Sequence, residues 1–511
     1  MAASKISFIG AGPGNPELIT LRGHALLKQA DVIFYDFALS PAFFHACSED
    51  CRLVPVRHEG HASKEALANV AQRMVEAARS GHRVVRLKVG DPLFFSRTLE
   101  DLETVCEAGI AIEIVPGIAS PLAASAFAGV PLTEPHGSRG LVFTSATDLL
   151  GRAMDAHAFI SMAEKAETLC IMLVVEQLRA VVGHLSDVSK FRHSPALLVH
   201  RASLPEQRVI EAPLLDLIAQ FDAHPLPEPS LLIVGNVVRY RRQLAWFESR
   251  PLFGKRLLLC RAREQAQDSA SAILQRGAAP ELLPLIEIEA YDNDRPLFAC
   301  IPQVAKANWV IFTSANGVER FRRAVIRAGK DARIFGSSRI AVIGPGTARP
   351  LEQWGIKPEL IAKEHVAENL ASELLASGPA SSAILIRALE ARDTLPESLR
   401  AAGISTEIVP AYQTRKLSQK QREPLLARLH AHTIDAVLLT SSSMADSLVM
   451  ALGDSAAEVL SRVCVASIGP ITSATLEKHG VTPSVTATTY TVEGLLDALE
   501  IHFEQNGAKT S

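Results

Sequence analysis

The chain has 511 residues, of which 48% are hydrophobic and 21% charged, so its composition is that of a globular protein and excludes a disordered or fibrous one. Its formal net charge of −3 and its 5% of aromatic residues argue against a general nucleic-acid binder. No apolar run approaches the roughly 20 residues of a membrane span, and about 150 residues per domain predicts three or four folding units.

The N-terminal segment MAASKISFIGAGPG has none of the regions of a signal peptide, and the seven cysteines are odd in number and scattered. We therefore expect a cytoplasmic protein with reduced thiols. Cys47, Cys51, His58 and His61 form one cluster that suggests a metal, but their spacing fits no common zinc template. A solvated loop after a helix is the better interpretation, so we predict no metal site.

Short apolar runs alternate with longer helical patterns along most of the chain, which favours an α/β fold with parallel sheets. The expected strands include Lys5–Ile9, Asp31–Tyr35, Arg83–Leu87, Ile112–Val115, Leu257–Cys260, Val310–Phe312, Ile340–Ile343, Ala383–Ile386 and Ala436–Leu439. Leu231–Val238 is predicted to be the last strand of the first half. The segment 243–254, with Pro251 and Gly254, then marks a break before a new strand.

Several loops of the first half follow expected strands directly. The loop Gly10–Pro16 is not a dinucleotide fingerprint, because Asn15 takes the place of its last glycine. Asp36 ends the second run and is either a proton acceptor or the cap of the next helix. Gly90–Pro92 and Pro116–Ile118 follow two further runs. Since parallel strands bring such loops to one edge, we expect one shared pocket.

These segments carry a resemblance. GAGPGNPELIT, YD at 35–36, RVVRLKVGDP, VPGIAS, GVPLT and PSLLIVGNVV resemble uroporphyrinogen-III C-methyltransferases over about residues 4–247. The resemblance implies two α/β lobes with S-adenosylmethionine between them. It assigns cofactor contacts to Pro13, Val89, Gly90, Asp91, Phe94, Ala119, Ser120, Leu173 and Ala202.

The same resemblance implies that Asp36 accepts the proton that a pyrrole carbon loses after methylation. Arg57 is the nearest candidate for the family's catalytic lysine. Val89, Leu173 and Ala202 depart from the family pattern, with Val89 and Ala202 standing where it has glycine. Side chains at glycine positions crowd a ligand, so a degenerate module is an alternative to an active one.

The second half contains an internal repeat. Ile343–Pro345 recurs as Ile468–Pro470, an offset of 468 − 343 = 125, and Phe312–Ser314 recurs as Leu439–Ser441, an offset of 439 − 312 = 127. The repeat predicts two similar α/β units with a ligand cleft between them. Strand-end loops rich in hydroxyls suit carboxylate binding, and they hold Thr313, Ser314, Thr347, Ser441 and Thr472.

This half, over about residues 252–504, resembles uroporphyrinogen-III synthase in WVIFTSANGVERF, IAVIGPGTA, VPAYQT, LLTSSSM, SIGPITSATLEKHG and YTVEGLLDAL. The family closes hydroxymethylbilane into a ring and inverts its last pyrrole, without metal or cofactor. Tyr412 matches the family tyrosine suspected of assisting loss of the substrate hydroxyl, and Tyr490 is a second candidate; for both, packing is the alternative. Arg387 is either a propionate ligand or a surface residue.

We predict a methyltransferase-like domain over 1–247, a linker over 248–254 and a synthase-like domain over 255–504. The lobes of the latter would be about 255–290 with 413–504, and about 291–412. The leading hypothesis is a bifunctional enzyme that makes uroporphyrinogen III and methylates it toward precorrin-2, for sirohaem or cobalamin. The alternatives are an active synthase with a non-catalytic methyltransferase-like module, and a tetrapyrrole-binding regulator. We expect tetrapyrroles as partners, no nucleic acid or membrane, and a homodimer through the first half.

Overall fold

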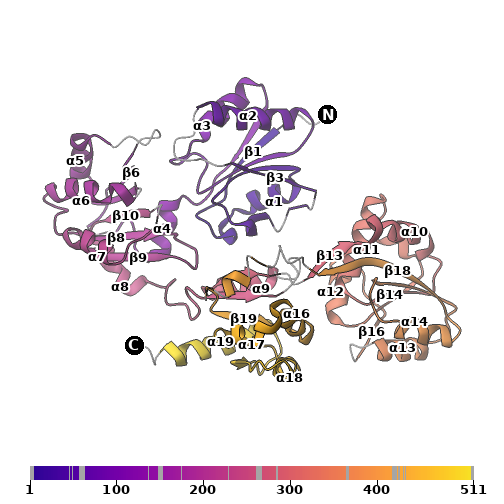
Figure 1. The fold of residues 1–511 in the computed structure, drawn as a ribbon. Helices are drawn as coiled ribbons and strands as arrows, with labels where there is room; N and C mark the ends of the chain where they lie inside the picture. Colours follow the sequence, from indigo (N-terminus) through magenta and orange to yellow (C-terminus); the bar gives the residue numbers. More distant parts are fainter. Residues whose placement is uncertain are drawn as a thin grey trace.

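A computed structural model describes residues 5–507 of the chain, apart from residues 45–46, 49, 57–63, 136, 148–153, 174, 228–229, 261–266, 284–285, 364–366, 417–422, 424–425, 430 and 432. The described strands form four sheets, each combined with helices (Figure 1). The α/β fold class is therefore confirmed. No helix in the described ranges is long and apolar enough to cross a membrane.

The first sheet has the strand order β3-β2-β4-β1-β5, and all its pairs are parallel. Its strands are β1 (Lys5–Gly10), β2 (Val32–Asp36), β3 (Arg52–Val56), β4 (Val84–Lys88) and β5 (Ala111–Val115). Its helices are α1 (Leu21–Gln29), α2 (Lys64–Arg79) and α3 (Thr98–Glu107). Every residue of β4 is buried, as expected for a parallel strand covered on both faces.

The second sheet corrects the expectation of parallel sheets. Its strands are β6 (Leu141–Ser145), β7 (Thr168–Leu173), β8 (Pro195–His200), β9 (Arg208–Pro213) and β10 (Ser230–Val234), in the order β6-β7-β10-β8-β9. Only the pair β6–β7 is parallel; β10 runs antiparallel to β7 and β8, and β9 antiparallel to β8. The loop 201–207 is too short for a parallel crossover, so β8 and β9 must form a hairpin.

Helices α4 (Ser120–Ala128), α5 (Ala156–Lys165), α6 (Leu178–Asp187), α7 (Leu217–Ala223) and α8 (Arg241–Leu244) accompany the second sheet. The predicted strand Leu231–Val238 is too long, because β10 ends at Val234. Gly235 has φ +143°, and a 3-10 helix, Asn236–Tyr240, follows. Val237 and Val238 are fully buried in that helix, and an apolar run alone does not distinguish a buried helical turn from a strand.

The third sheet, β12-β11-β19-β20-β21, is entirely parallel and draws on distant parts of the sequence. Its strands are β11 (Arg256–Leu259), β12 (Ala279–Leu282), β19 (Ala436–Leu439), β20 (Cys464–Ser467) and β21 (Val485–Thr486). Its helices are α9 (Gln267–Gln275), α16 (Ser442–Leu452), α17 (Ala456–Leu460), α18 (Pro470–Lys478) and α19 (Val492–Gly507).

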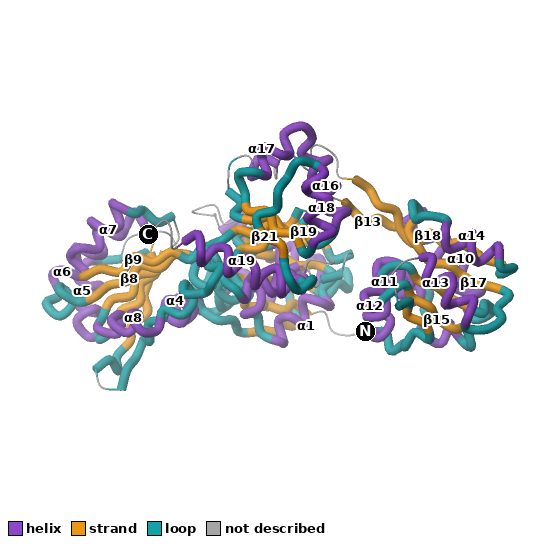
Figure 2. Tube along the Cα trace, turned by 90° about the horizontal axis from the view of Figure 1, so that it is seen from below, coloured by secondary structure: helices purple, strands orange, loops and turns teal. Residues whose placement is uncertain are grey.

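The fourth sheet lies between these segments in the sequence and has the order β13-β18-β17-β14-β15-β16. Its strands are β13 (Ile286–Ala290), β14 (Trp309–Phe312), β15 (Arg339–Val342), β16 (Leu360–Ile361), β17 (Ser382–Ala388) and β18 (Ser405–Lys416). Its helices are α10 (Arg295–Val304), α11 (Ala315–Arg327), α12 (Pro345–Gln353), α13 (Ala367–Ala376) and α14 (Thr394–Ala401). The antiparallel pair β13–β18 extends from this lobe toward the lobe of the third sheet (Figure 2). The domain limits proposed from the sequence remain predictions.

Candidate functional site

The first candidate site lies at the carboxyl edge of the first sheet, where the loops after β1, β4 and β5 meet. Gly12 and Gly90 exchange two backbone hydrogen bonds of 3.1 and 2.8 Å, so the loops after β1 and β4 are joined. A Cβ on Gly10 would stand 2.5 Å from the backbone nitrogen of Gly117, and Gly90 has φ +69°. Glycine is therefore required at this crossing, both for space and for backbone conformation.

Asp91 fastens two of these loops together. One carboxylate oxygen accepts a hydrogen bond from the backbone N–H of Gly117 at 3.0 Å, and the other accepts from Leu93 N–H at 2.8 Å. The side chain thus supports the geometry of the edge.

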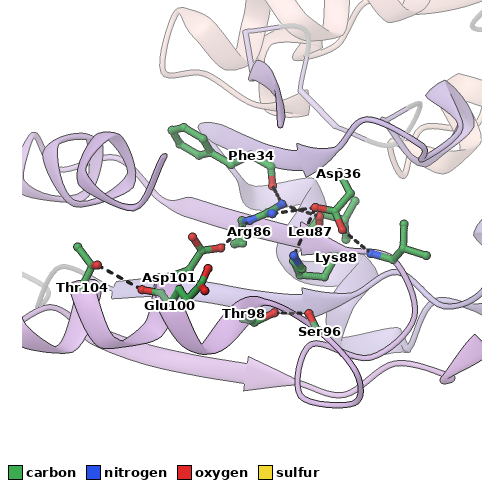
Figure 3. A network of polar contacts seen from close by, with 11 residues as sticks. Phe34, Asp36, Arg86, Leu87, Lys88, Ser96, Thr98, Glu100, Asp101 and Thr104 are labelled. Atoms are coloured by element: carbon green, nitrogen blue, oxygen red, sulfur yellow. Dashed lines mark hydrogen bonds and ion pairs between the residues drawn. The ribbon is translucent and has the colours of Figure 1, made fainter. Parts of the chain in front are cut away.

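Asp36, at the end of β2, belongs to a buried ionic network (Figure 3). Its carboxylate accepts a hydrogen bond from Nη2 of Arg86 at 2.7 Å and another from the backbone N–H of Val89 at 3.1 Å. Arg86 has no exposed side-chain surface, and its Nε lies 3.1 Å from Asp101. Asp36 itself is 13% exposed. The carboxylate is thus held in place by β4 and by the first residue of the loop after it.

Lys88 also faces this network, with Nζ 3.6 Å from Asp36. Burial, aided by the nearby Arg86 charge, lowers the pKa of Lys88, although Asp36 and Asp101 act in the opposite direction. The sequence reading did not assign roles to Arg86, Lys88 or Asp101. A signal was present, because two cations at alternate positions of an otherwise apolar run point to the same face of a buried strand.

A cavity of about 1500 Å³ opens beside this edge. It is lined by the first sheet's loops, including Pro13, Val89 and Ser120, and by Leu173 and Ala202 of the second lobe. The structure therefore brings these five predicted cofactor contacts together from two lobes. The cavity has this volume with the side chains of Val89, Leu173 and Ala202, which depart from the family pattern, in its lining.

Of the other predicted cofactor contacts of this half, Gly90, Asp91, Phe94 and Ala119 are not among the residues that line the cavity. Gly90 and Asp91 form the loop crossing described above. Phe94 lies with its ring centroid 5.5 Å from that of Phe143 in β6, so it packs across to the second lobe. Ala119 is 6% exposed and immediately precedes α4. Arg57 falls outside the described residues.

The candidate residues of the C-terminal half lie at helix N-termini that follow strands of the third and fourth sheets. Ser314 follows β14, and its Oγ accepts a hydrogen bond from Gly317 N–H at 3.1 Å, which caps α11. Ser441 follows β19 and caps α16 through a 3.3 Å hydrogen bond from Met444 N–H. The internal repeat therefore corresponds to a repeated strand–Ser–helix unit. Both N-termini offer backbone N–H groups and a positive dipole end to anions.

Tyr412 lies in the fourth sheet beside the first of these N-termini. Its hydroxyl donates a hydrogen bond to Ser314 Oγ at 3.0 Å, and the side chain is 8% exposed. The register between β17 and β18 shifts by one residue here, so that Ala388 pairs with Tyr412 after Arg387 pairs with Pro410. Such irregularities re-aim a side chain, and this one accompanies the contact between Tyr412 and the start of α11.

Tyr490 is 65% exposed and lies over Gly469, where a Cβ would be 2.9 Å from Cδ1 of its ring. A side chain at Gly469 would therefore displace the ring. Thr347 and Thr472 occupy corresponding places in α12 and α18, and they are only 5% and 3% exposed. Both threonines are thus largely buried in the first turn of their helices. Thr313 is half-buried at the end of β14.

Arg387, at the carboxyl end of β17, is 6% exposed and so is not a surface residue. Its guanidinium donates to the Arg392 carbonyl at 2.7 Å and to the Asp393 carboxylate at 2.5 Å. Its Nε is buried without a hydrogen-bond partner. One donor of this cation therefore remains unused, while its charge is already paired.

The described residues contain no group of three or more His, Cys, Asp and Glu side chains placed to hold a metal ion. Of the cluster considered from the sequence, His58 and His61 lie outside those residues. Burial raises the pKa of the Cys47 thiol to about 12, which disfavours the thiolate form that metals bind.

Comparison with known proteins divides the chain in the same two parts. The family described as tetrapyrrole (corrin/porphyrin) methylases matches residues 5–218, and the family described as uroporphyrinogen-III synthase HemD matches residues 267–497. A porphyrin biosynthesis protein HemD of Ruminiclostridium josui is 27% identical, and the alignment covers 97% of both chains.

A siroheme synthase of Psychrobacter sp. (strain PRwf-1) is 35% identical over 48% of this chain, and the chain spans only 50% of that relative's length. A solved structure of uroporphyrin-III C-methyl transferase from Thermus thermophilus, complexed with S-adenyl homocysteine, is 30% identical. The alignment covers 46% of this chain and 99% of that one, with a TM-score of 0.40. The chain thus carries a region that matches the tetrapyrrole methylase family, followed by a region that matches the uroporphyrinogen-III synthase family.

Proposed function

We propose that this chain catalyses two consecutive steps of tetrapyrrole biosynthesis. The C-terminal half closes hydroxymethylbilane to uroporphyrinogen III, and the N-terminal half methylates that product with S-adenosylmethionine toward precorrin-2. The observation that carries the methyl-transfer part is the fixed carboxylate of Asp36, which hydrogen-bonds Val89 N–H beside a cavity lined by two lobes.

The cavity is large enough for the proposed cofactor, and the chemistry of its lining suits it. Pro13, Val89, Leu173 and Ala202 supply apolar surface, and Ser120 supplies a hydroxyl at the start of α4. These five residues, with Gly90, Asp91, Phe94 and Ala119 shaping the surrounding loops, are proposed to hold S-adenosylmethionine. When bound, it would supply an electrophilic methyl group to a pyrrole carbon.

Asp36 is proposed to remove the proton that the methylated carbon must lose. Its hydrogen bond from Nη2 of Arg86 holds the carboxylate in a fixed position for that role. Its hydrogen bond to Val89 N–H couples the carboxylate to the loop that lines the cavity. The base and the proposed cofactor loop are thus held by one set of contacts. Arg57 stays a proposed participant on the resemblance alone.

In the C-terminal half, Tyr412 is proposed to assist departure of the substrate hydroxyl. The Ser314 Oγ, which accepts from both Tyr412 and Gly317, fixes the direction of the phenol. Thr313, Ser314, Thr347, Ser441 and Thr472 are proposed to bind substrate carboxylates with the adjacent backbone N–H groups, and Arg387, at the carboxyl end of β17, stays a proposed propionate ligand. Tyr490 is proposed to face the same substrate from the other lobe. No cofactor is proposed for this half.

The alternative is an active synthase joined to a non-catalytic methyltransferase-like module. The side chains of Val89, Leu173 and Ala202 in the cavity lining support it. Two further parts of the proposal, a homodimer through the N-terminal half and a cytoplasmic location, are supported by the resemblance and by the seven free cysteines, respectively.

The test is to incubate the protein with hydroxymethylbilane, with and without S-adenosylmethionine, and to separate the products after oxidation. We expect the type III isomer in both reactions and methylated type III product only with S-adenosylmethionine. Type III isomer without any methylated product would establish the alternative. The spontaneous type I isomer alone would exclude both enzyme functions.

A further inference from the structure

The cavity of the N-terminal half is bounded partly by the C-terminal half. Besides the two N-terminal lobes, its lining includes Ala270, Ser271 and Leu274 of α9 and all of β12 (Ala279–Leu282). Figure 1 shows α9 between the N-terminal lobes and the rest of the third-sheet lobe. The synthase half thus supplies part of the lining of a space that is also lined by five of the proposed cofactor contacts.

A side-chain contact joins this wall to the N-terminal half. The Ser271 hydroxyl donates a hydrogen bond to the Glu17 carboxylate. Glu17 belongs to the 3-10 helix Pro16–Leu18, which directly follows the loop that contains Pro13. Glu17 and Ser271 both line the cavity. The position of α9 is therefore linked to the loop after β1.

The segment between the halves is packed against both of them and is not a loose tether. On the N-terminal side, Trp246 Nε1 donates to the Ala126 carbonyl at 2.9 Å, and Phe247 is 2% exposed. On the other side, Arg250 Nη1 donates to the Leu274 carbonyl at 3.2 Å, and Leu252 N–H donates to the Arg276 carbonyl at 3.2 Å. These contacts fix α9 with respect to the N-terminal half.

The same segment is bonded to the loop between β8 and β9, which also lines the cavity. Gln207 donates to the Glu248 carboxylate at 3.0 Å and accepts from Ser203 N–H at 3.2 Å. Arg201 and Ser203 have φ values of +50° and +73°, and residues other than glycine rarely adopt this backbone conformation. Contacts with the segment between the halves therefore help to hold a strained loop that carries Ala202.

From these contacts we propose that α9 and β12 of the synthase half form one wall of the methyltransferase cleft. The affinity of that cleft for its cofactor therefore depends on residues of the synthase half. This inference rests on the proposed function of the N-terminal half. The cavity's volume, about 1500 Å³, exceeds the roughly 300–1,000 Å³ of common single-ligand pockets, so the wall encloses more space than the cofactor alone needs. β12 is an edge strand of its sheet, so this wall includes the edge of the third sheet.

The experiment measures binding of S-adenosylhomocysteine to full-length variants by isothermal titration calorimetry. Ala270→Trp places a large side chain at the cavity wall, and we expect at least tenfold weaker binding. Asp268→Trp is the matched control, because Asp268 is an exposed residue of the same helix and is not among the residues that line the cavity. Formation of the type III isomer should be unchanged in both variants. Equal affinity of the Ala270→Trp variant and the control would overturn the proposal.

A second pair of variants decides the matter if Ala270→Trp disturbs folding, as judged by circular dichroism. Ser271→Glu brings a negative charge to Glu17, whereas Ser271→Lys brings a positive one at similar length. We expect at least threefold weaker S-adenosylhomocysteine binding for Ser271→Glu than for Ser271→Lys, and equal binding contradicts the wall. A wild-type protein that makes type III isomer but binds no S-adenosylhomocysteine would instead overturn the methyltransferase function itself.

Discussion

The Asp36 site of the N-terminal half and the Tyr412 site of the C-terminal half differ in how their polar groups are paired. Asp36 lies in a network of full charges, with Arg86 completely buried and Asp101 beside it. Tyr412 instead contacts a neutral hydroxyl, Ser314, which also caps a helix. The first site holds a charged proton acceptor, and the second presents hydroxyls and backbone N–H groups.

This difference matches the chemistry proposed for each half. A base that must remain ionised in a mostly buried site needs a buried cation, and that cation needs further carboxylates. A site for a substrate with many carboxylates gains more from neutral donors and helix N-termini, which bind anions without burying a compensating charge of their own. Changes at the first site should therefore cost both activity and stability, whereas those at the second should mainly reduce activity.

The largest expected effect is that of Asp36→Asn on methyl transfer. Loss of a positioned general base typically lowers a rate by about 10²–10⁴-fold, and we expect a loss in that range with type III formation unchanged. The measurement is transfer of labelled methyl from S-adenosylmethionine to uroporphyrinogen III. Asp31→Asn is the control, since Asp31 is a more exposed carboxylate just before the same strand. A rate within twofold of wild type would show that Asp36 is not the base.

Next in size is the effect of Arg86→Met on stability. The variant leaves Asp36 and Asp101 without their buried cation, and such a loss typically costs about 3–5 kcal/mol. We expect a decrease of that order in the free energy of unfolding of the N-terminal half, measured by urea denaturation. The control, Arg83→Met, removes an exposed pair with Asp31 and should cost about 1 kcal/mol or less. Similar losses for the two variants would contradict a special role for burial.

A smaller effect is expected for Tyr412→Phe. Phenylalanine keeps the packing of the ring and removes only the hydroxyl that donates to Ser314. We expect type III formation to fall by about tenfold or somewhat more, below the usual range for a full general acid because the hydroxyl mainly orients the leaving group. The assay follows the ratio of type III to spontaneous type I isomer. Retention of the wild-type ratio would indicate that the ring serves packing alone.

The smallest effect concerns the pH dependence that Lys88 imposes on stability. Its pKa is lowered in the folded protein, while in the unfolded chain it stays near 10.5. At pH values below the folded pKa, Lys88 is protonated in both states, and the cost of burying its charge destabilises the folded protein in full. As the pH rises toward 10.5, the folded protein releases the Lys88 proton before the unfolded chain does, so the free energy of unfolding increases. The stability of wild type relative to Lys88→Met should therefore rise over this window. A constant difference would show that Lys88 does not titrate differently on folding.

Much of the fold was predictable because parallel strands are continuous apolar runs between turn residues, as in β11, β14 and β19. The repeat offset likewise predicted the paired strand–Ser–helix units of Ser314 and Ser441. The antiparallel arrangement of the second sheet was missed, because local apolarity gives the length of a strand and not its direction.

The site was predictable only in part. Loops at strand ends indicated a shared edge, and the resemblance supplied candidate residues for it. The roles of Arg86, Lys88 and Asp101 depend on which side chains a strand and a helix bring together, which spacing alone does not give. The place of α9 in the cavity lining could not be predicted either, because it depends on how the two halves pack together.

The most direct test of two separate sites in one chain compares Asp36→Asn and Tyr412→Phe in the same assay, starting from hydroxymethylbilane with S-adenosylmethionine. Our account predicts that Asp36→Asn accumulates unmethylated type III isomer. It also predicts that Tyr412→Phe makes little type III isomer from hydroxymethylbilane yet methylates added uroporphyrinogen III at the wild-type rate. If either variant lost both activities while remaining folded, the assignment of one reaction to each half would be contradicted.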